Sequence, residues 1–199
     1  MRVIVGLGNP GSQYAGSRHN LGFAVVEELS RRWRLPLGRA RHGLRMAAGS
    51  VAGQHVALIE PQMYVNVSGP ALGHAGQHIE AKRLIVVHDD LDLGLGSVRV
   101  KCGGGTAGHH GLDSIVERYG RDFVRVRVGV GRPPRGQDSV DYVLARFHEQ
   151  EREIVAGAVA RAADAVECII IEGEQAAMNT FNVRPRKCPS LQAEPVGRN

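Results

Sequence analysis

The chain alternates between short apolar segments and longer segments of helical periodicity, and this alternation constrains its fold more than any other feature. The first apolar segment, residues 2–7, is rich in β-branched side chains and ends at a glycine-rich turn, which is typical of a buried strand at the centre of a sheet. Along residues 20–33, apolar side chains recur at helical spacing, and Ser17 or Asn20 is available as the N-cap. A strand that leads into a helix in this way indicates an α/β protein.

Further segments continue the alternation to residue 182. We predict strands over residues 44–52 and 55–60, which form a hairpin, and over residues 84–88, 97–102 and 123–130. We predict helices over residues 68–79, 110–119, 149–172 and 174–182. The fold class is therefore α/β, a single-domain three-layer sandwich with a mixed, mostly parallel central sheet flanked by helices. We expect this domain to span residues 1–183, and residues 184–199, with prolines and little apolar material, to form a mobile C-terminal tail.

The composition is that of one ordinary globular domain. A chain of 199 residues has room for one compact domain, and its 43% hydrophobic and 23% charged residues exclude a wholly disordered chain. The longest apolar stretches, residues 84–87 and 168–171, are far shorter than the roughly 20 residues that span a bilayer. Residues 1–8 lack a secretory signal, and Cys102, Cys168 and Cys188 form no C-x-x-C pair. We therefore expect a cytoplasmic monomer with free thiols and no membrane contact.

The charge of the chain favours an anionic partner. Lysine and arginine outnumber the acidic residues by 25 to 20, which gives a formal net charge of +5 at pH 7. Several arginines are crowded between residues 31 and 45. Such an excess suits a polyanion such as a nucleic acid but does not identify it.

The glycine-rich turn after the first strand, residues 6–11, matches the pattern of a dinucleotide-binding turn. That function requires a helix to start within the motif and an acidic residue to end the next strand. Here Pro10 and the polar residues 11–18 delay the helix, while Glu27 and Glu28 lie inside it. We therefore expect no dinucleotide and no other cofactor.

Polar residues stand just beyond the carboxyl ends of three predicted strands, where ligands collect in open α/β sheets. Asn9 follows the first strand, Asn66 lies a few residues past the strand that ends at residue 60, and Asp89 follows strand 84–88. His19, at the start of the first helix, returns to the same edge. An imidazole can take a proton from water, a carboxylate can fix its tautomer, and amides can donate to an oxyanion.

The convergence of these four residues predicts a hydrolytic site in which activated water attacks the substrate directly. No serine lies in a G-x-S-x-G elbow, so a serine acyl-enzyme has no support. Taken singly, each of the four could instead only cap a helix or hold a loop. A metal ion could also activate the water, and its candidate ligands are His88, Asp89, Asp90, Asp92, His109 and His110. Because no zinc-type spacing such as H-E-x-x-H occurs, we expect no metal.

A glycine-rich loop, residues 101–111, joins a predicted strand to a predicted helix. The free backbone amides of its three consecutive glycines, at a helix start, would favour an anion, and Lys101 would add a charge beside it. Arg125 and Arg127 lie two residues apart on the next strand and share one face, which suits phosphate contact in the same area. The loop lacks the G-K-[ST] ending of a P-loop, so we expect no nucleoside triphosphate hydrolysis, and its glycines could also form only a flexible turn.

Five motifs together resemble those of bacterial peptidyl-tRNA hydrolases in order and spacing. They are LGNPGSQY with SRHNLGF, PQMYVNVSG, VVHDDLDLGLG, KCGGGTAGHHGL and RVRVGVGRP. The resemblance covers residues 2–182, nearly the whole chain. It implies a metal-independent esterase that cuts the bond between a peptide and the 3′-terminal ribose of tRNA and so recycles tRNA from aborted translation.

The resemblance also implies roles for individual residues. His19 in SRHN matches the catalytic base, Asp89 in HDD matches its carboxylate partner, and Asn9 in GNPG matches an amide that positions substrate and water. The substrate-binding residues implied in the same way are Tyr14, Asn20, Tyr64, Asn66 and His110, and the residues implied to hold the 5′-terminal phosphate of tRNA are Lys101 and Arg127.

Two positions depart from the family pattern. Val65 stands where many members have methionine, and His110 stands where the motif G-H-N-G has an asparagine whose amide contributes to the site. We expect activity to survive with a changed pH dependence or weaker substrate placement. The alternative is a non-catalytic RNA- or protein-binding member of the same fold, for which residues 33–37, with one tryptophan and two leucines, are the candidate docking patch. Retention of the four site residues favours the enzyme.

Overall fold

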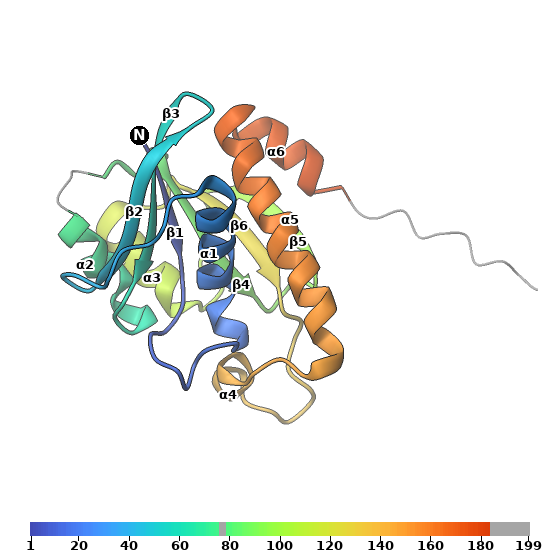
Figure 1. Ribbon diagram of the computed structural model, residues 1–199. Coiled ribbons are helices and arrows are strands. Elements are labelled where there is room, and N and C mark those ends of the chain that lie inside the picture. Colours follow the sequence, from blue (N-terminus) through green and yellow to red (C-terminus); the bar gives the residue numbers. More distant parts are fainter. Residues whose placement is uncertain (76–78, 184–199) are drawn as a thin grey trace, which may run out of the picture.

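The computed structural model describes residues 1–75 and 79–183 and contains a six-stranded mixed sheet (Figure 1). The strands are β1 (Arg2–Gly6), β2 (Leu44–Val51), β3 (Gln54–Pro61), β4 (Leu84–Asp90), β5 (Val98–Cys102) and β6 (Val124–Gly129). They lie in the order β2-β3-β1-β4-β6-β5. The four central strands run parallel, whereas β2 and β5 pair antiparallel at the two edges. The carboxyl ends of β1, β3, β4 and β6 therefore meet at one edge of the sheet.

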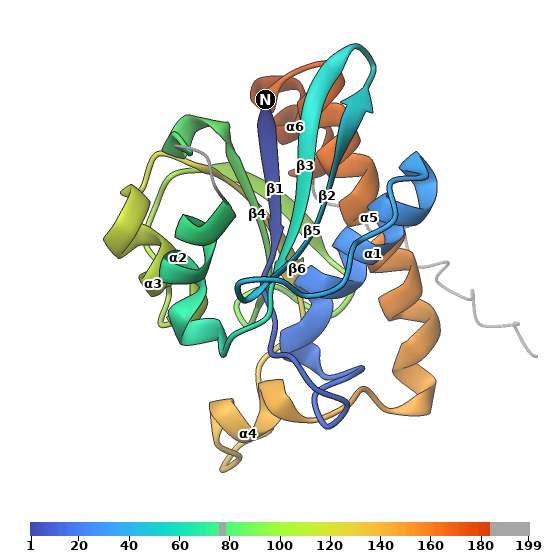
Figure 2. The same cartoon turned by 60° about the vertical axis from the view of Figure 1, so that its left-hand side comes forward.

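Helices form the two outer layers. The α-helices of the described residues are α1 (Leu21–Trp33), α2 (Ser68–Leu72), α3 (His110–Tyr119), α4 (Ser139–Leu144), α5 (Arg152–Ile171) and α6 (Glu174–Phe181). Figure 2 shows α2 and α3 on one side of the sheet, α1, α5 and α6 on the other, and α4 beyond the carboxyl ends of the parallel strands. The predicted three-layer α/β fold with a mixed, mostly parallel sheet is thus confirmed. In the part of the chain that the structure describes, no helix is both long and apolar enough to cross a membrane.

Each face of the sheet builds its own apolar core, because successive strand residues point to opposite faces. On one face, Ile4 packs with the buried alanines of α5, among them Ala162 and Ala163. On the other face, Val5 packs with Leu112 of α3. The central strands are buried on both sides, which explains why their sequences are continuously apolar rather than alternating.

The helix predicted over residues 68–79 is much shorter in the structure. α2 ends at Leu72 and continues only as a 3-10 turn, Gly73–Ala75, and residues 76–78 lie outside the described residues. Each glycine in a helix interior costs about 1 kcal/mol relative to alanine, and the predicted segment contains three of them. Gly69 is required despite this cost, because a Cβ there would collide with the backbone carbonyl of Ser114.

Other boundaries also differ from the prediction. β4 includes Asp89 and Asp90, so the acidic turn starts inside the strand. Neither Ser17 nor Asn20 caps the first helix through its side chain, because a 3-10 turn, Arg18–Asn20, precedes α1. Helix α4 was not predicted, and Asp138 caps it by accepting the amides of residues 140 and 141. The tail predicted for residues 184–199 lies outside the described residues.

Gly22 brings α1 into direct backbone contact with the carboxyl ends of β1 and β4. A Cβ at Gly22 would collide with backbone atoms of Leu7 and Val87. We expect Gly22→Ala to lower the free energy of unfolding by about 1–3 kcal/mol or more, because rigid backbone has to move to admit one methyl group. Urea unfolding measures this change.

Gly157 in α5 is the matched control, because outside the neighbouring helix backbone no atom of the described residues lies within 4 Å of a Cβ built there. Gly157→Ala should stabilise the protein by about 0.5–1 kcal/mol through helix propensity. Equal effects of the two substitutions would contradict the close contact between α1 and the sheet.

Candidate active site

A cleft of about 870 Å³ opens at the carboxyl edge of the parallel strands, and α4 forms part of its wall. Of the predicted site residues, those that line it are Asn9, Tyr14, His19, Tyr64, Asn66, Asp89 and His110. The structure therefore brings together residues that are up to 101 positions apart in the sequence (9 to 110). Asn20, Lys101 and Arg127 are absent from this lining.

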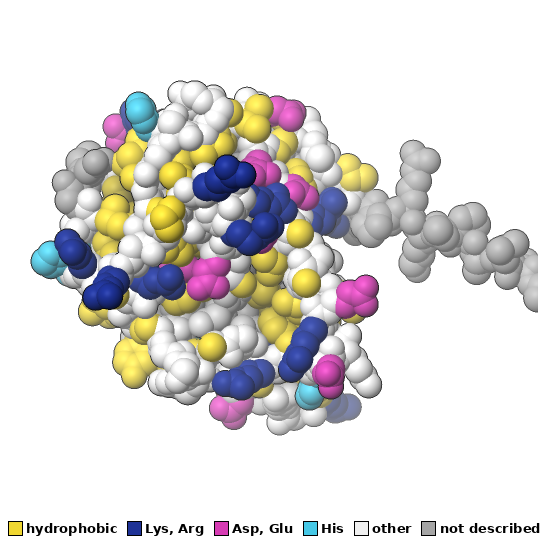
Figure 3. All heavy atoms as spheres, in the orientation of Figure 1, with side chains coloured by type: hydrophobic (Ala, Val, Ile, Leu, Met, Phe, Trp, Pro, Cys, Tyr) yellow, Lys and Arg dark blue, Asp and Glu magenta, His cyan; other side chains and the backbone are white. Residues whose placement is uncertain are grey.

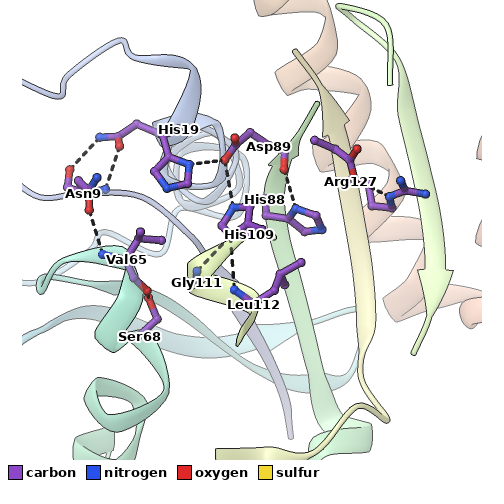
Figure 4. A network of polar contacts seen from close by, with 12 residues as sticks. Asn9, His19, Val65, Ser68, His88, Asp89, His109, Gly111, Leu112 and Arg127 are labelled. Atoms are coloured by element: carbon purple, nitrogen blue, oxygen red, sulfur yellow. Dashed lines mark hydrogen bonds and ion pairs between the residues drawn. The ribbon is translucent and has the colours of Figure 1, made fainter. Parts of the chain in front are cut away.

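His19 and Asp89 form the central contact of the cleft. His19 lies in the 3-10 turn before α1, and its Nδ1 is 2.8 Å from Oδ1 of Asp89, the penultimate residue of β4 (Figure 4). Both side chains are buried, with exposures of 11% and 3%. Because the carboxylate accepts at Nδ1, neutral His19 carries its proton there. Its Nε2 has no protein partner among the described residues, so this nitrogen is the free basic atom of the site.

The pKa values of the two groups are shifted in the directions that keep this pair polarised. Burial by itself lowers the pKa of His19, but the charge of Asp89 and the hydrogen bond to it outweigh burial, so the pKa is raised above 6.5. Burial by itself raises the pKa of Asp89, but the nearby imidazoles hold it far below its usual range. Asp89 is therefore a carboxylate at neutral pH.

His109 is a third member of this cluster, although its sequence position indicated only a candidate metal ligand. Its Nε2 lies 3.2 Å from Oδ1 of Asp89. Its Nδ1 accepts the backbone amides of Gly111 and Leu112, at 3.1 and 3.4 Å, and so caps α3. The signal available in the sequence was its place directly before the first residue of a predicted helix, which is where a side-chain acceptor is needed.

His88 supports the cluster from inside β4. Its Nδ1 lies 2.7 Å from the backbone carbonyl of Asp89, and its ring meets that of His109 edge to face at 5.1 Å between centroids. Burial, followed by the neighbouring His109, lowers the pKa of His88 to about 3. His88 is therefore neutral and adds no positive charge beside Asp89.

Asn9 presents its side-chain NH₂ group to the cleft, because its Oδ1 atom already accepts a hydrogen bond within the protein. Its Oδ1 accepts the backbone amide of Val65 at 2.9 Å, which leaves the two N–H groups of Nδ2 free of protein partners among the described residues. Asn20 lies behind it: Oδ1 of Asn20 accepts the amide of Asn9 and Nδ2 donates to its carbonyl, both at 2.9 Å. Asn20 thus supports Asn9 rather than lining the cleft as the family resemblance implied.

The rim of the cleft carries more exposed side chains. Tyr64 is 62% exposed, and the side chain of Asn66, which also lines the cleft, makes no hydrogen bond to another described residue. The His110 side chain is 72% exposed, with its Nδ1 3.7 Å from a carboxylate oxygen of Asp113. The unusual histidine thus stands at the edge of the site, where its bulk can be accommodated.

Arg18 ties the residue next to His19 to the segment that follows α4. Its guanidinium is 3% exposed and donates to both carboxylate oxygens of Glu151, at 3.0 and 2.7 Å. It also lies over the rings of Tyr142 and Phe147, 4.4 and 4.9 Å from their centroids. This buried cation fixes both the turn that carries His19 and one wall of the cleft.

The basic residues predicted around the glycine loop are placed differently from one another. Lys101 is exposed, whereas Arg127 donates to Asp90 at 2.7 Å. Arg125 is buried and donates to the carbonyls of Gly104 and Gly105, so it holds the loop rather than facing outward. His109 occupies the amides of Gly111 and Leu112 at the start of α3, so these two amides are not available to an anion, and a site on the amides of the loop glycines stays a prediction.

Three of the six arginines between residues 31 and 45 are paired with carboxylates within the chain. Arg31 pairs with Glu28 at 2.8 Å, Arg32 with Asp164 at 2.7 Å, and Arg45 with Glu60 at 2.8 Å. Figure 3 shows basic and acidic side chains lying next to one another on this face. The local charge is therefore smaller than the sequence indicates.

The residues predicted as a docking patch for a non-catalytic binding protein are partly buried in the fold. Trp33, Leu35 and Leu37 are partly buried and pack against the core that α1 and α5 share. The indole Nε1 of Trp33 donates to Glu167 at 2.9 Å. These residues therefore do not form a free apolar surface.

His19, Asp89 and His109 are also a group that could hold a metal ion, since one ligand atom of each lies within 4.8 Å of the others. Their contacts are those of hydrogen bonds, however. Nδ1 of His19 and Nε2 of His109 both face the same carboxylate oxygen at 2.8 and 3.2 Å, and Nδ1 of His109 accepts backbone amides. An ion would have to replace the protons on both rings, so the donor set fits a hydrogen-bonded cluster better.

A histidine that is oriented by a buried carboxylate, and that faces a cleft with free amide donors, defines a hydrolytic enzyme of the α/β class. The family model for peptidyl-tRNA hydrolase matches residues 3–189. The chain belongs to this family, whose reaction is hydrolysis of the ester bond of peptidyl-tRNA.

Individual relatives agree with the family model. The chain is 52% identical over 182 residues to peptidyl-tRNA hydrolase of Rubrobacter xylanophilus, which covers 90% of this chain and 99% of that protein. It is 44% identical over 186 residues to the enzyme of Chloroflexus aggregans, covering 92% and 99%. The crystal structure of peptidyl-tRNA hydrolase from Acinetobacter baumannii superimposes with a TM-score of 0.86 at 34% identity and covers 92% of this chain and 95% of that chain.

Proposed function

We propose that this chain hydrolyses peptidyl-tRNA through a water molecule that His19 activates directly. The observation that carries the proposal is the 2.8 Å contact between Nδ1 of His19 and Asp89, which leaves Nε2 as the free base of the cleft. Water bound at Nε2 gives its proton to that nitrogen as its oxygen attacks the carbonyl carbon of the ester. Asp89 stabilises the imidazolium that forms.

Collapse of the tetrahedral intermediate completes the reaction. The bond between the carbonyl carbon and the 3′-terminal ribose oxygen breaks, and the imidazolium returns its proton to that oxygen. The products are a peptide with a free carboxyl group and a tRNA with a free ribose hydroxyl. Nδ2 of Asn9 is placed to donate to the oxyanion of the intermediate, because Oδ1 of Asn9 is held by the amide of Val65.

The remaining site residues are proposed to hold the two parts of the substrate. Tyr14, Tyr64 and Asn66 line the cleft and would contact the acyl group and the terminal nucleotide. Lys101 and Arg127 would bind the 5′-terminal phosphate, outside the cleft. Because Arg127 is paired with Asp90 at 2.7 Å, its phosphate contact would use the N–H groups that this pair leaves free.

Hydrolysis of N-acetyl-aminoacyl-tRNA compared with free aminoacyl-tRNA tests the substrate class. A free α-amino group is cationic or nearly so, whereas an acylated nitrogen is a neutral amide that can donate to an acceptor such as Asn66. We expect faster release of the acetylated amino acid, and loss of that preference in Asn66→Ala. Equal cleavage of both substrates by the wild-type protein would contradict the proposed role of Asn66.

The pH profile should report the protonation of His19. Only neutral His19 can accept a proton, and its pKa is raised above 6.5 by Asp89, so kcat/KM should rise with pH and reach its plateau well above pH 6.5. Asp89→Asn removes the charge that raises this pKa and leaves burial, which lowers it. We expect the acid limb of the kcat/KM profile to move to lower pH in Asp89→Asn and its plateau to fall. If the acid limb does not move, the titration belongs to another group.

His110→Asn should increase activity. The asparagine amide is smaller than the imidazole and offers both a hydrogen-bond donor and an acceptor. A neutral hydrogen bond is worth about 0.5–1.5 kcal/mol, so we expect a gain in kcat/KM of about 2- to 10-fold. Lower activity would mean that the rest of the site is adapted to the histidine.

We also propose that the enzyme acts as a monomer in the cytoplasm. One chain supplies every side chain of the cleft, and ribosomes produce the substrate in that compartment. Sedimentation in the presence and absence of tRNA tests the oligomeric state, and a dimer that dissociates with loss of activity would contradict it.

A further inference from the structure

His109 connects the start of α3 to the His19–Asp89 pair. It takes no part in the proton transfers proposed for the reaction. Its Nδ1 accepts the amides of Gly111 and Leu112 at 3.1 and 3.4 Å, and its Nε2 lies 3.2 Å from Oδ1 of Asp89. Its side chain is 9% exposed. It is therefore held at both nitrogens by the protein.

The helix cap decides which nitrogen of His109 carries the proton. A nitrogen that accepts N–H groups has to present a lone pair, so the neutral ring is protonated at Nε2. That N–H points to Asp89, as Figure 4 shows by the dashed line between the two residues. The backbone amides at the start of α3 therefore hold the Nε2–H of His109 as a donor to Asp89. Side-chain substitutions in α3 leave these amides in place.

Asp89 consequently receives two imidazole N–H groups on the same oxygen. His19 donates to Oδ1 at 2.8 Å and His109 at 3.2 Å, and the two rings lie 4.9 Å apart between centroids. A second donor draws negative charge away from the first, so it weakens the hold of the carboxylate on His19. It also prevents the carboxylate from turning away, because Oδ1 is fixed from two sides.

We propose that His109 is a positioning residue of this hydrolase: the cap of α3 directs its N–H to Asp89, and there it both orients the carboxylate and moderates its pull on His19. The proposal rests on the proposed function only in that His19 is taken as the base. His109 need not touch the substrate to play this part.

Two substitutions separate the two contacts of His109. The Oδ1 atom of asparagine occupies a position similar to Nδ1 of histidine, so His109→Asn keeps the cap but is too short to reach Asp89. The Nε2 atom of glutamine occupies a position similar to Nε2 of histidine, so His109→Gln keeps a donor to Asp89 but loses the cap. The Asn variant should retain the melting temperature of the wild type, and the Gln variant should melt at a lower temperature.

Several other groups near His19 can titrate or carry charge, so the readout has to be specific to His19. From β4 they are His88, Asp89 and Asp90, and from the other walls of the cleft they are Asp92, His109, His110 and Arg132. Titration of the His19 ring by NMR, with its resonance assigned through His19→Gln, isolates this group. It needs no substrate, so it gives an answer even if the protein fails to hydrolyse peptidyl-tRNA.

In His109→Asn, we expect the NMR titration of His19 to move upward by about 0.5–1 pH unit, because Asp89 keeps its full charge for one partner. We expect kcat to fall about 10- to 100-fold with little change in KM, since the base is less well oriented. His109→Gln should titrate like the wild type and keep most of kcat.

Three results would overturn the proposal. One is an unchanged His19 titration in His109→Asn. Another is an equal shift in the Asn and Gln variants, which would assign the effect to packing. The third is a rise in KM with kcat unchanged, which would place His109 in contact with the substrate. Failure of the wild-type protein to cleave N-acetyl-aminoacyl-tRNA would instead contradict the proposed function and leave the titration result standing.

Discussion

Replacement of His19 by alanine should lower kcat/KM for N-acetyl-aminoacyl-tRNA by about 10²- to 10⁴-fold, the contribution of a positioned general base. Among the residues that the structure describes, Nε2 of His19 has no hydrogen-bond partner, so removal of this side chain leaves the attacking water without a proton acceptor in that position. Because tRNA contacts are proposed to lie outside the His19 turn, tRNA affinity should change little. Single-turnover rates and a filter-binding assay measure the two quantities separately.

The control for this prediction is His55→Ala. His55 is an exposed histidine near the start of β3, at the end of the sheet opposite the cleft. Its removal should leave activity within about twofold of the wild type, as expected for a surface substitution. A His19→Ala enzyme that keeps a tenth or more of wild-type kcat/KM would show that His19 is not the base.

Glu151→Gln should lower the free energy of unfolding strongly. It leaves the guanidinium of Arg18, 3% exposed, without its carboxylate partner. Breaking a buried pair by neutralising one member costs about 3–5 kcal/mol, because an uncompensated charge remains in the interior. Urea unfolding followed by circular dichroism measures the loss, and kcat should fall as well because Arg18 precedes His19.

Glu80→Gln is the matched control for this second prediction. Glu80 pairs with Arg83 at 3.3 Å, but both side chains are more than half exposed, at 59% and 53%. An exposed pair of this kind contributes about 0–1 kcal/mol. If Glu151→Gln and Glu80→Gln destabilise the protein equally, Arg18 does not anchor the segment after α4.

The parts of the fold that were predicted correctly are those with strong local patterns. β1 and the first four residues of β4 contain runs of apolar residues, and α5 has 20 residues with a clear apolar stripe, so residue type alone indicated their structure. α4 was missed because it has only six residues and no buried ones. Its position depends on distant contacts instead, such as the bond from the Tyr142 hydroxyl to the carbonyl of Val130 at 2.7 Å.

The same distinction applies to the site. The sequence allowed the prediction that His19 and Asp89 lie close together, because the carboxyl ends of parallel strands meet at one edge of the sheet. The place of His109 could not be derived, because it depends on a loop in which Ala107 and Gly108 adopt left-handed φ angles of 50° and 78°. The role of Asn20 was likewise hidden, since its side chain turns back to the backbone of Asn9 rather than into the cleft.

The most direct test of the central claim is the turnover of N-acetyl-aminoacyl-tRNA by protein that a chelator has freed of metal. We predict an unchanged rate, because the neutral imidazole of His19 activates the water and Asp89 accepts two N–H groups. Loss of turnover in chelator, restored by one equivalent of a divalent metal per chain, would contradict it. That result would show that His19, Asp89 and His109 are the ligands of a metal ion and not a hydrogen-bonded cluster.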